Sequence, residues 1–465
     1  MGKKQTKKKF KQPDAYVILF SVLLIAALLT YIIPAGSFER ELTESGQSIV
    51  VPGSYERIEQ QPAQFFDIFV SIQEGLIGAS GMIFLVLIIG GTFTVIEKTG
   101  AINSIIMRTI NKTKNKEWLL ITIVAALLSV LGGFGIVSIS VIAFIPIGIS
   151  LARGMKMDAI VGVSIMYLGA YSGFAIGFMD PIRTGFAQDI AQIPKFSGIV
   201  ERLGLYAVIV IVTILYIIWY ANRVKKNPEN SILGDDRFPK LDQSKEEVSL
   251  EITFTHKLVI LLLAAGIGFY IYGAFKYQWG TNEMAAMFIL IAIGTGIIAR
   301  MGTNNLVKTF IDGCKNIFYG AAIIGLARAV VIVMSEGMIL DTIVYGIYNV
   351  IQNFPSVFGA IAMLFVNGMF NFIVSSGTAH AAIIMPIMSP LADLIGITRQ
   401  VAVQAYTMGD GFTNVINPLS GTLMAILAIS GIPLGKWLRF AIPLVLLWFV
   451  IGILFMVFAV ATGWS

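Results

Sequence analysis

Long apolar stretches separated by short polar loops dominate the pattern of this chain. Several runs of roughly 20 mostly apolar residues are each long enough, as a helix, to cross a hydrocarbon layer of about 30 Å. Examples are the runs 15–34, 205–220, 258–275, 285–299 and 440–460. Because lipid offers the backbone no hydrogen-bond partners, such runs predict an all-α polytopic membrane protein. The first run is too long for the apolar part of a typical signal peptide, so we expect it to be retained.

The composition supports the same prediction. Of 465 residues, 56% are hydrophobic and 13% are charged, and a water-soluble globule cannot bury so much apolar surface. The single cysteine, Cys314, excludes an intramolecular disulfide and a multi-cysteine metal site. The net charge of +6 does not indicate a nucleic-acid partner, because the basic residues gather in particular loops.

Those basic loops predict the orientation of the chain. Residues 1–14 are rich in lysine, and two further clusters of basic residues lie in 108–116 and 223–226. By the positive-inside rule all three lie in the cytoplasm, so 1–14 is a cytoplasmic N-terminus of a multi-pass protein of the bacterial inner (plasma) membrane. The turn-rich segment 39–61 then lies outside.

Two similar halves flank a polar stretch at 222–254, which we interpret as a cytoplasmic linker. A shift of 240 places Pro146 on Pro386, and a shift of 237 places Pro181 on Pro418. The basic loops make residues 76–98 run inward, whereas the matching residues 316–335 run outward. The halves 15–221 and 255–465 are therefore predicted to be inverted repeats, an architecture that secondary transporters use.

Within each half, two segments are poor candidates for a continuous helix. Glycines and hydroxyls interrupt residues 132–140 and 370–378, which we interpret as the tips of re-entrant hairpins spanning about 117–153 and 355–395. Further along, Asp180-Pro181-Ile182-Arg183-Thr184-Gly185 and Asn417-Pro418-Leu419-Ser420-Gly421-Thr422 each predict a break, in helices spanning about 157–195 and 398–432. A broken helix exposes carbonyl and amide groups that can hold ions.

Charged residues inside apolar stretches need a functional or structural reason, since each costs roughly 3 kcal/mol or more in mid-membrane. The Arg183 guanidinium can hold a substrate carboxylate, or it can pair with Asp180. Asp180 can bind a substrate amine or a coupling cation. Arg328 can face the cavity or tie helices together. Asp410 can hold a proton, a cation or an amino group, or it can join two helices.

Neutral polar residues at the tips and breaks complete the candidate site. His380 can couple proton movement to transport or be structural, and the hydroxyls can contact a ligand or cap helices. The candidate substrate-binding residues are Ser138, Asp180, Arg183, Thr184, Arg328, Ser375, Ser376, Thr378, Asp410, Asn414 and Asn417. The candidate residues for a coupling Na⁺ or proton are Ser140, Asp180, His380, Asp410, Asn417 and Ser420.

Motifs of other functional classes are absent from the sequence. There is no phosphate-binding Gly-Lys-Ser/Thr loop, no His-Glu-x-x-His and no credible Ser/His/Asp set. We therefore expect neither an enzyme nor an ATP-driven pump, and no cofactor.

Three short segments resemble a known family. Pro34-Ala35-Gly36-Ser37-Phe38, Gly185-Phe186-Ala187-Gln188 and Met408-Gly409-Asp410-Gly411-Phe412-Thr413-Asn414 are similar to the YfcC branch of the four-carbon dicarboxylate anaerobic carrier (DcuC-like) family. The resemblance implies the ion transporter superfamily, with inverted repeats, two re-entrant hairpins and an elevator mechanism. It also implies a transport domain beside a scaffold domain that forms a homodimer.

The resemblance leaves two substrates open. The family name implies dicarboxylates, whereas relatives in the YfcC branch include arginine/ornithine exchangers. Where that branch has Asn-Pro-Phe-Thr, this chain has Asp180-Pro181-Ile182-Arg183, which suits a zwitterion held by its carboxylate at Arg183 and its amine at Asp180. A dicarboxylate would require Asp180 to be neutralised, for example by Arg328. We expect a secondary active transporter, ion-coupled or exchanging, for an amino acid such as arginine or ornithine; the alternatives are a dicarboxylate carrier and a channel.

Overall fold

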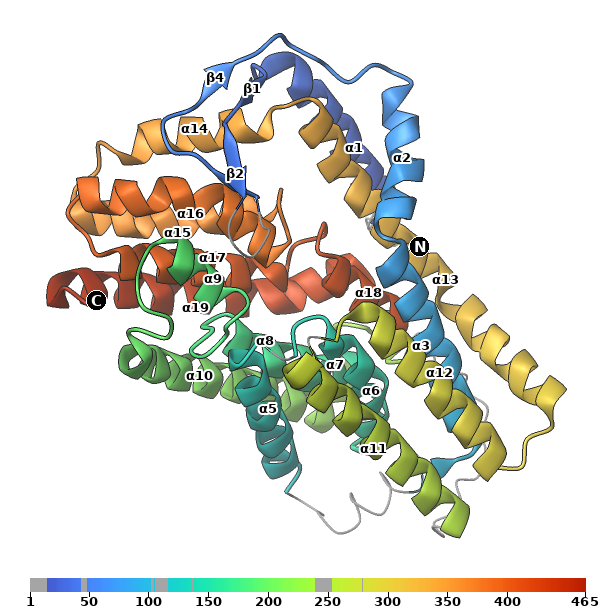
Figure 1. Ribbon diagram of the computed structural model, residues 1–465. Coiled ribbons are helices and arrows are strands. Elements are labelled where there is room, and N and C mark those ends of the chain that lie inside the picture. The colour runs from blue at the N-terminus through green and yellow to red at the C-terminus, as the bar shows by residue number, and fades with distance from the viewer. Residues whose placement is uncertain are drawn as a thin grey trace, which may run out of the picture.

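The computed structural model of the protein describes residues 15–42, 48–101, 104, 116–135, 137–238, 253–277 and 279–465. The predicted basic N-terminus 1–14, residues 239–252 of the predicted linker and the loop residues Arg108, Lys112 and Lys114 lie outside this part of the chain. Most of the described residues are helical (Figure 1).

The first half of the chain contains eight of the described α-helices. They are α1 (Ala15–Ile32), α2 (Asp67–Gly78), α3 (Ser80–Lys98), α5 (Glu117–Gly133), α6 (Ile145–Gly154), α7 (Ala159–Val163), α8 (Gly169–Phe174) and α9 (Thr184–Ile190). A 3-10 turn over Ser140–Phe144 precedes α6, and a π-helical turn over Ser164–Leu168 joins α7 to α8 without ending the helix.

Helix α10 (Ile199–Lys226) leads from the first half to the second. The later helices are α11 (Phe254–Tyr277), α12 (Thr281–Ile298), α13 (Thr303–Glu336), α14 (Leu340–Ile351), α15 (Ser356–Asn371), α16 (Gly377–Leu394), α17 (Arg399–Asn414), α18 (Gly421–Ser430) and α19 (Leu434–Thr462). Helix α10 continues five residues into the predicted linker, because Arg223, Lys225 and Lys226 favour a helix C-terminus.

Six described helices are long and apolar enough to cross a membrane. They are Ser80–Lys98, Ile199–Lys226, Phe254–Gly273, Thr281–Ile298, Thr303–Glu336 and Leu434–Thr462. Large apolar side chains such as Leu215, Leu290 and Leu446 lie exposed on their surfaces. So much exposed apolar surface is stable in lipid and unstable in water, and the chain is a membrane-embedded protein.

The description as all-α needs one correction in the polar segment after α1. Strand β1 (Gly36–Ser37) pairs antiparallel with β4 (Glu56–Arg57), and β2 (Arg40–Leu42) pairs with β3 (Ser48–Val50). The segment is held against α14, because the Asp341 carboxylate accepts hydrogen bonds from the Arg40 guanidinium at 2.8 Å and from the Phe38 amide at 3.0 Å. Sequence reasoning predicted only turns here, because these strands are two or three residues long.

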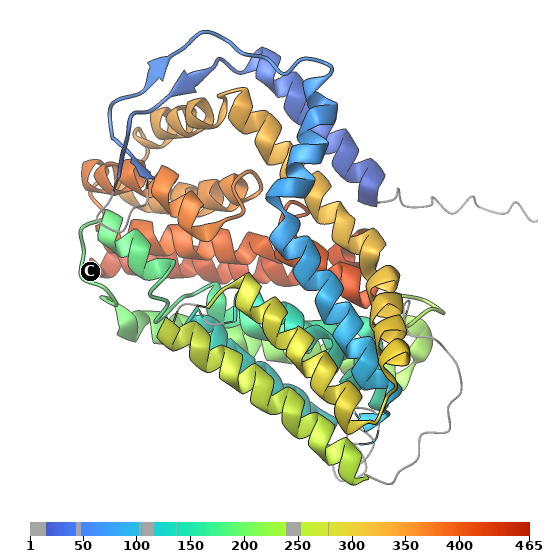
Figure 2. The same cartoon turned by 45° about the vertical axis from the view of Figure 1, so that its right-hand side comes forward.

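One group of helices packs around α13, the longest. Helices α2 and α3 lie along α13 in both views (Figures 1 and 2), with Gly75 against Gly325 and Gly90 against Gly313. Glycines on both sides of a crossing let the two backbones approach closely. Helix α12 packs against α3, and α11 packs against α12.

Helices α8, α9, α17 and α18 flank the two predicted breaks. The chain is non-helical over 175–183 between α8 and α9, and over 415–420 between α17 and α18. The two predicted tips are also interrupted: α5 ends at Gly133 before the 3-10 turn, and α15 ends at Asn371 before α16 begins at Gly377. Both breaks follow a fully buried helix, so the backbone groups that they free lie inside the protein.

Candidate functional site

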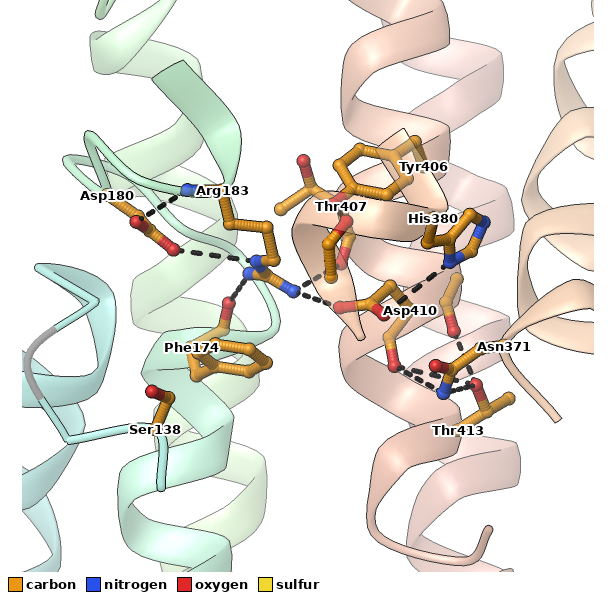
Figure 3. A network of polar contacts seen from close by, with 12 residues as sticks. Ser138, Phe174, Asp180, Arg183, Asn371, His380, Tyr406, Thr407, Asp410 and Thr413 are labelled. Carbon is orange, nitrogen blue, oxygen red and sulfur yellow. Dashed lines mark hydrogen bonds and ion pairs between the residues drawn. The ribbon is translucent and has the colours of Figure 1, made fainter. Parts of the chain in front are cut away.

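Arg183 lies between two carboxylates from opposite halves of the chain. Its Nη1 donates to Oδ2 of Asp410 at 2.6 Å, and its Nε lies 3.5 Å from Oδ2 of Asp180. Figure 3 shows the Arg183 side chain extending from the first break to Asp410 of α17. All three side chains are at least 95% buried. The local pair that sequence reasoning allowed, Asp180 with Arg183, is therefore one part of a larger contact.

Asp180 also organises the first break. Its Oδ1 accepts hydrogen bonds from the backbone amides of Ile182 and Arg183, each at 3.0 Å. Pro181 has no amide hydrogen to donate, so this turn satisfies the next two amides before α9 begins. The turn Asp180-Pro181-Ile182-Arg183 thus brings the Asp180 carboxylate next to the Arg183 guanidinium.

The other donors of Arg183 are used by the protein. Nη1 donates to the Thr407 carbonyl at 3.4 Å, and Nη2 donates to the Phe174 carbonyl at the end of α8. The guanidinium carbon lies 3.7 Å from the centre of the Phe174 ring, within range of a cation–π contact. Arg183 is therefore held by several contacts within the protein in this structure, and its binding of a substrate carboxylate stays a prediction.

His380 extends the network behind Asp410. Its Nδ1 lies 3.5 Å from Oδ1 of Asp410, and its Nε2 lies 3.0 Å from Oδ1 of Asn367 on α15. The imidazole is fully buried between the rings of Phe370 and Tyr406, with ring centres 5.1 and 5.0 Å away. Its orientation is therefore constrained from four sides.

Asn371, the last residue of α15, links the second tip to both parts of the second broken helix. Its Nδ2 donates to the Asp410 carbonyl at 3.1 Å and to the Thr413 hydroxyl at 2.9 Å. Its own carbonyl accepts a hydrogen bond from Nδ2 of Asn417 at 2.6 Å. Oδ1 of Asn417 accepts from the Leu419 amide at 2.8 Å, so one amide side chain satisfies groups at the tip and at the break.

The remaining candidates at the tips and breaks have smaller roles in this geometry. The Ser375 hydroxyl donates to the Leu419 carbonyl at 3.4 Å, and Ser420 caps α18 by accepting from the Leu423 amide at 3.4 Å. Ser376 is exposed and Thr378 is half-buried at the start of α16. The tip therefore presents hydroxyls beside the buried network.

The candidates on the first half, together with Asn414, contribute mainly backbone groups. Carbonyl oxygens of Ser138 and Asn414 accept hydrogen bonds from the Tyr171 and Tyr167 hydroxyls at 3.4 and 3.2 Å. Ser140 is buried at the start of its 3-10 turn. It lies beside α11 and α12, where it lines a small apolar pocket, and away from the Arg183 network.

Arg328 is a further candidate, besides Ser140, that the structure does not bring to this network. It is exposed on α13, and its Nε lies 3.7 Å from the position that a Cβ on Gly78 would occupy. None of the ion pairs in the described part of the chain includes it. Arg328 therefore does not neutralise Asp180 here, and Arg183 does so instead.

Several buried polar atoms of the network have no hydrogen-bond partner among the described residues. They are Nε of Arg183, Oγ1 of Thr184, Oδ1 of Asn371, Nδ1 of His380, Oε1 of Gln404 and Oδ1 of Asp410. Three of them lie 3.5 Å from another polar atom of the network, since Nε of Arg183 faces Asp180 and Nδ1 of His380 faces Oδ1 of Asp410. The other three, on Thr184, Asn371 and Gln404, have hydrogen-bonding capacity left for water or a polar ligand.

Sequence reasoning missed three neighbours of this network: Asn367, Tyr406 and Thr407. Asn367 precedes Asn371 by one helical turn in an otherwise apolar stretch, and Thr407 precedes Asp410 by three positions. Polar residues spaced by three or four positions share a face of a helix, and that spacing was the available signal. Among the described residues no group of three or more His, Cys, Asp or Glu side chains could hold a metal ion.

Comparison with known proteins places the chain in a wider group. The model of the family "C4-dicarboxylate anaerobic carrier" (DcuC) matches residues 12–461 of this chain. A protein of Escherichia coli named "Putative basic amino acid antiporter YfcC" is 30% identical, with 96% of each chain covered. An uncharacterized protein of Haemophilus influenzae is also 30% identical, with 99% of each chain covered.

Two solved transporter structures have more distant similarity. The YdaH transporter of Alcanivorax borkumensis is 14% identical at a TM-score of 0.41, with 97% of this chain and 99% of that chain covered. MtrF of Neisseria gonorrhoeae is 16% identical at a TM-score of 0.41, with 97% and 96% covered. The family match and the two relatives each span nearly the whole sequence, and the chain belongs to the C4-dicarboxylate anaerobic carrier family, a family of membrane transporters.

Proposed function

We propose that the protein is a secondary antiporter that exchanges basic amino acids, such as arginine for ornithine, at the buried network around Arg183. The observation that carries the proposal is the placement of one guanidinium between two carboxylates, Asp180 and Asp410. Among these three groups one negative charge is left over, and the buried Arg202 makes no ion pair with either carboxylate in the described part of the chain. A cationic side chain would balance that charge, whereas a dicarboxylate would add two more negative charges to it.

The α-carboxylate of such a substrate has a separate place to bind. Helix α16 starts beside Arg183, since a Cβ on Gly377 would lie 2.7 Å from Cδ of Arg183. Ser376 precedes this helix without capping it, so the first amides of α16 are free to bind an anion together with the Ser376 and Thr378 hydroxyls. The α-carboxylate of a basic amino acid bound there would accept hydrogen bonds from these hydroxyls and amides, and its cationic side chain would lie near the Asp180 and Asp410 carboxylates. The name of the Escherichia coli relative supports the same substrate class.

The transport architecture is also part of the proposal. We infer two inverted repeats, because α7 to α8 covers 159–174 and α17 covers 399–414, so that both ends differ by 240. Asp158 and Thr398 cap these helices in the same way, each accepting from the amide three residues later. Two opposed repeats with paired breaks suit alternating access, here by elevator movement of the broken helices against a dimeric scaffold in the inner membrane, with the N-terminus in the cytoplasm.

The coupling ion, where exchange uses one, would bind in the same network. Oδ1 of Asp410 and Oδ1 of Asn371 are buried oxygens without hydrogen-bond partners among the described residues. Such oxygens can hold Na⁺, and His380 beside Asp410 offers a proton site instead.

Counterflow in liposomes tests the function. Vesicles loaded with ornithine should take up labelled arginine, and Asp180→Asn and Asp410→Asn should each reduce the initial rate at least tenfold. Asp393→Asn is the matched control, because Asp393 is an exposed carboxylate paired with Arg399. Exchange of four-carbon dicarboxylates without exchange of arginine would overturn the substrate, and full exchange by Arg183→Ala together with Asp410→Asn would overturn the site.

A further inference from the structure

A second polar cavity lies far along the helices from the Arg183 network. It has a volume of about 340 Å³ and lies where four helices begin or end. Its lining residues are Lys98, Thr99, Thr255, Ala299, Met301 and Asn305. Lys98 is the last residue of α3, and Ala299 and Met301 come just after α12. Thr255 and Asn305 lie in the first turns of α11 and α13.

The charge at this cavity is positive. The Lys98 ammonium donates to Oδ1 of Asn305 at 3.0 Å and to the Thr309 hydroxyl at 3.1 Å, both neutral oxygens. Arg300 lies between two lining residues, and its side chain is exposed. Among the described residues that line the cavity there is no carboxylate. An anion in this cavity could therefore bind the Lys98 ammonium, which Asn305 and Thr309 hold in place without neutralising its charge.

His256 adds a donor at the edge of the cavity. It follows the lining residue Thr255, and its Nε2 lies 3.8 Å from the position that a Cβ on Gly100 would occupy. Its Nδ1 is buried without a hydrogen-bond partner among the described residues. The Thr99 hydroxyl already donates to the Ile96 carbonyl at 2.6 Å, so the Thr255 hydroxyl and the imidazole are the neutral donors near Lys98 that an oxyanion could use.

The surroundings indicate how such an anion would be delivered. The helices that bound the cavity carry exposed apolar side chains, including Phe254, Leu261, Ile297 and Val307, which face lipid in a membrane. The positive-inside orientation puts these helix ends at the cytoplasmic leaflet, whose anionic lipids bind basic pockets between helices. We propose that the cavity binds the phosphate of an anionic phospholipid of the cytoplasmic leaflet, with its acyl chains against the neighbouring apolar surface.

Lipid competition on the purified full chain tests this site. Native mass spectrometry would count bound phosphatidylglycerol against phosphatidylcholine with the same acyl chains. We expect at least a fivefold preference for phosphatidylglycerol, retained in Lys98→Arg and reduced to near unity in Lys98→Gln and Asn305→Asp. Lys315→Gln is the matched control, since Lys315 is an exposed lysine on α13 paired with Asp312, and its preference should not change.

Inorganic phosphate tests whether the cavity binds free phosphate or the phosphate group of a phospholipid. Added alone at millimolar concentration, it should leave the melting temperature within one degree of the untreated protein, whereas phosphatidylglycerol vesicles should raise it. An increase with phosphate equal to that with the lipid would overturn the lipid assignment. A phosphatidylglycerol preference that is unchanged in both Lys98→Gln and Asn305→Asp would overturn the site. Neither lipid binding nor the melting temperature depends on arginine exchange, so these experiments test the lipid site independently of the proposed transport function.

Discussion

Nη1 of Arg183 donates to Oδ2 of Asp410 at 2.6 Å, and the two residues are 227 positions apart in the chain. Arg183 is the last residue of the first helix break, whereas Asp410 lies on α17 shortly before the second. The contact therefore joins the two halves of the protein at the point where both have interrupted helices. Because both side chains are buried, each depends on the other for compensation of its charge.

A double-mutant cycle should measure this dependence. Arg183→Met leaves the buried Asp410 without its guanidinium partner, and Asp410→Leu leaves Arg183 with Asp180 as its one remaining ion-pair partner among the described residues, so each should cost about 3–5 kcal/mol. The double variant should cost clearly less than the two single variants together, because it leaves neither partner of the 2.6 Å contact unpaired. Thermal unfolding followed by tryptophan fluorescence gives the comparison. Costs that simply add would show that the pair is not coupled.

Asn371→Ala should reduce arginine exchange about tenfold, equivalent to about 1.4 kcal/mol. The substitution removes Oδ1, a candidate ion ligand, and the hydrogen bonds to Asp410 and Thr413. It keeps the Asn371 carbonyl that accepts from Asn417, so the break itself should persist. Asn349→Ala, an exposed asparagine on α14, should exchange normally. Equal rates for the two variants would remove the Asn371 side chain from the site.

The crossing of α5 and α8 predicts a large effect at one glycine. A Cβ on Gly173 would collide with the carbonyl of Ser129 and would lie 2.8 Å from the Gly133 amide nitrogen. Gly173→Ala should therefore destabilise the protein by about 1–3 kcal/mol, because backbone must move. Gly204→Ala on α10 meets nothing within 4 Å and should be neutral or stabilising by up to about 1 kcal/mol. Melting temperatures of the two variants that agree within error would contradict the close approach.

Trp437 satisfies a carbonyl that the second break leaves free. Its Nε1 donates to the Val415 carbonyl at 2.8 Å, and the indole is fully buried. Trp437→Phe keeps most of the apolar contact and removes the donor, so it should cost about 1–3 kcal/mol of stability. Trp219→Phe replaces an exposed indole on α10 and should change the melting temperature little. A loss at Trp219 as large as that at Trp437 would argue against this role.

Much of the local structure followed from the order of residues. The two helix breaks contain Pro181 and Pro418, as expected, but they begin several residues earlier, since α8 ends at Phe174 and α17 at Asn414. The interruptions at 134–135, 137–139 and 372–376 fall inside the segments chosen for their glycines and hydroxyls. The short β strands were missed, because pairs of two or three residues leave no periodicity to detect.

The sequence by itself determined the membrane class, the family, the approximate positions of the helix breaks and several of the polar residues that form the buried network around Arg183. These features depend on local composition, on backbone chemistry or on motifs that can be compared directly. Only the tertiary structure decided the partners. It brought Arg183 to Asp410 and Asn371 to Asn417, and it left Arg328 exposed on α13. A pairing across 227 positions has no local signature, because it is the packing of separate helices that places the two charges together.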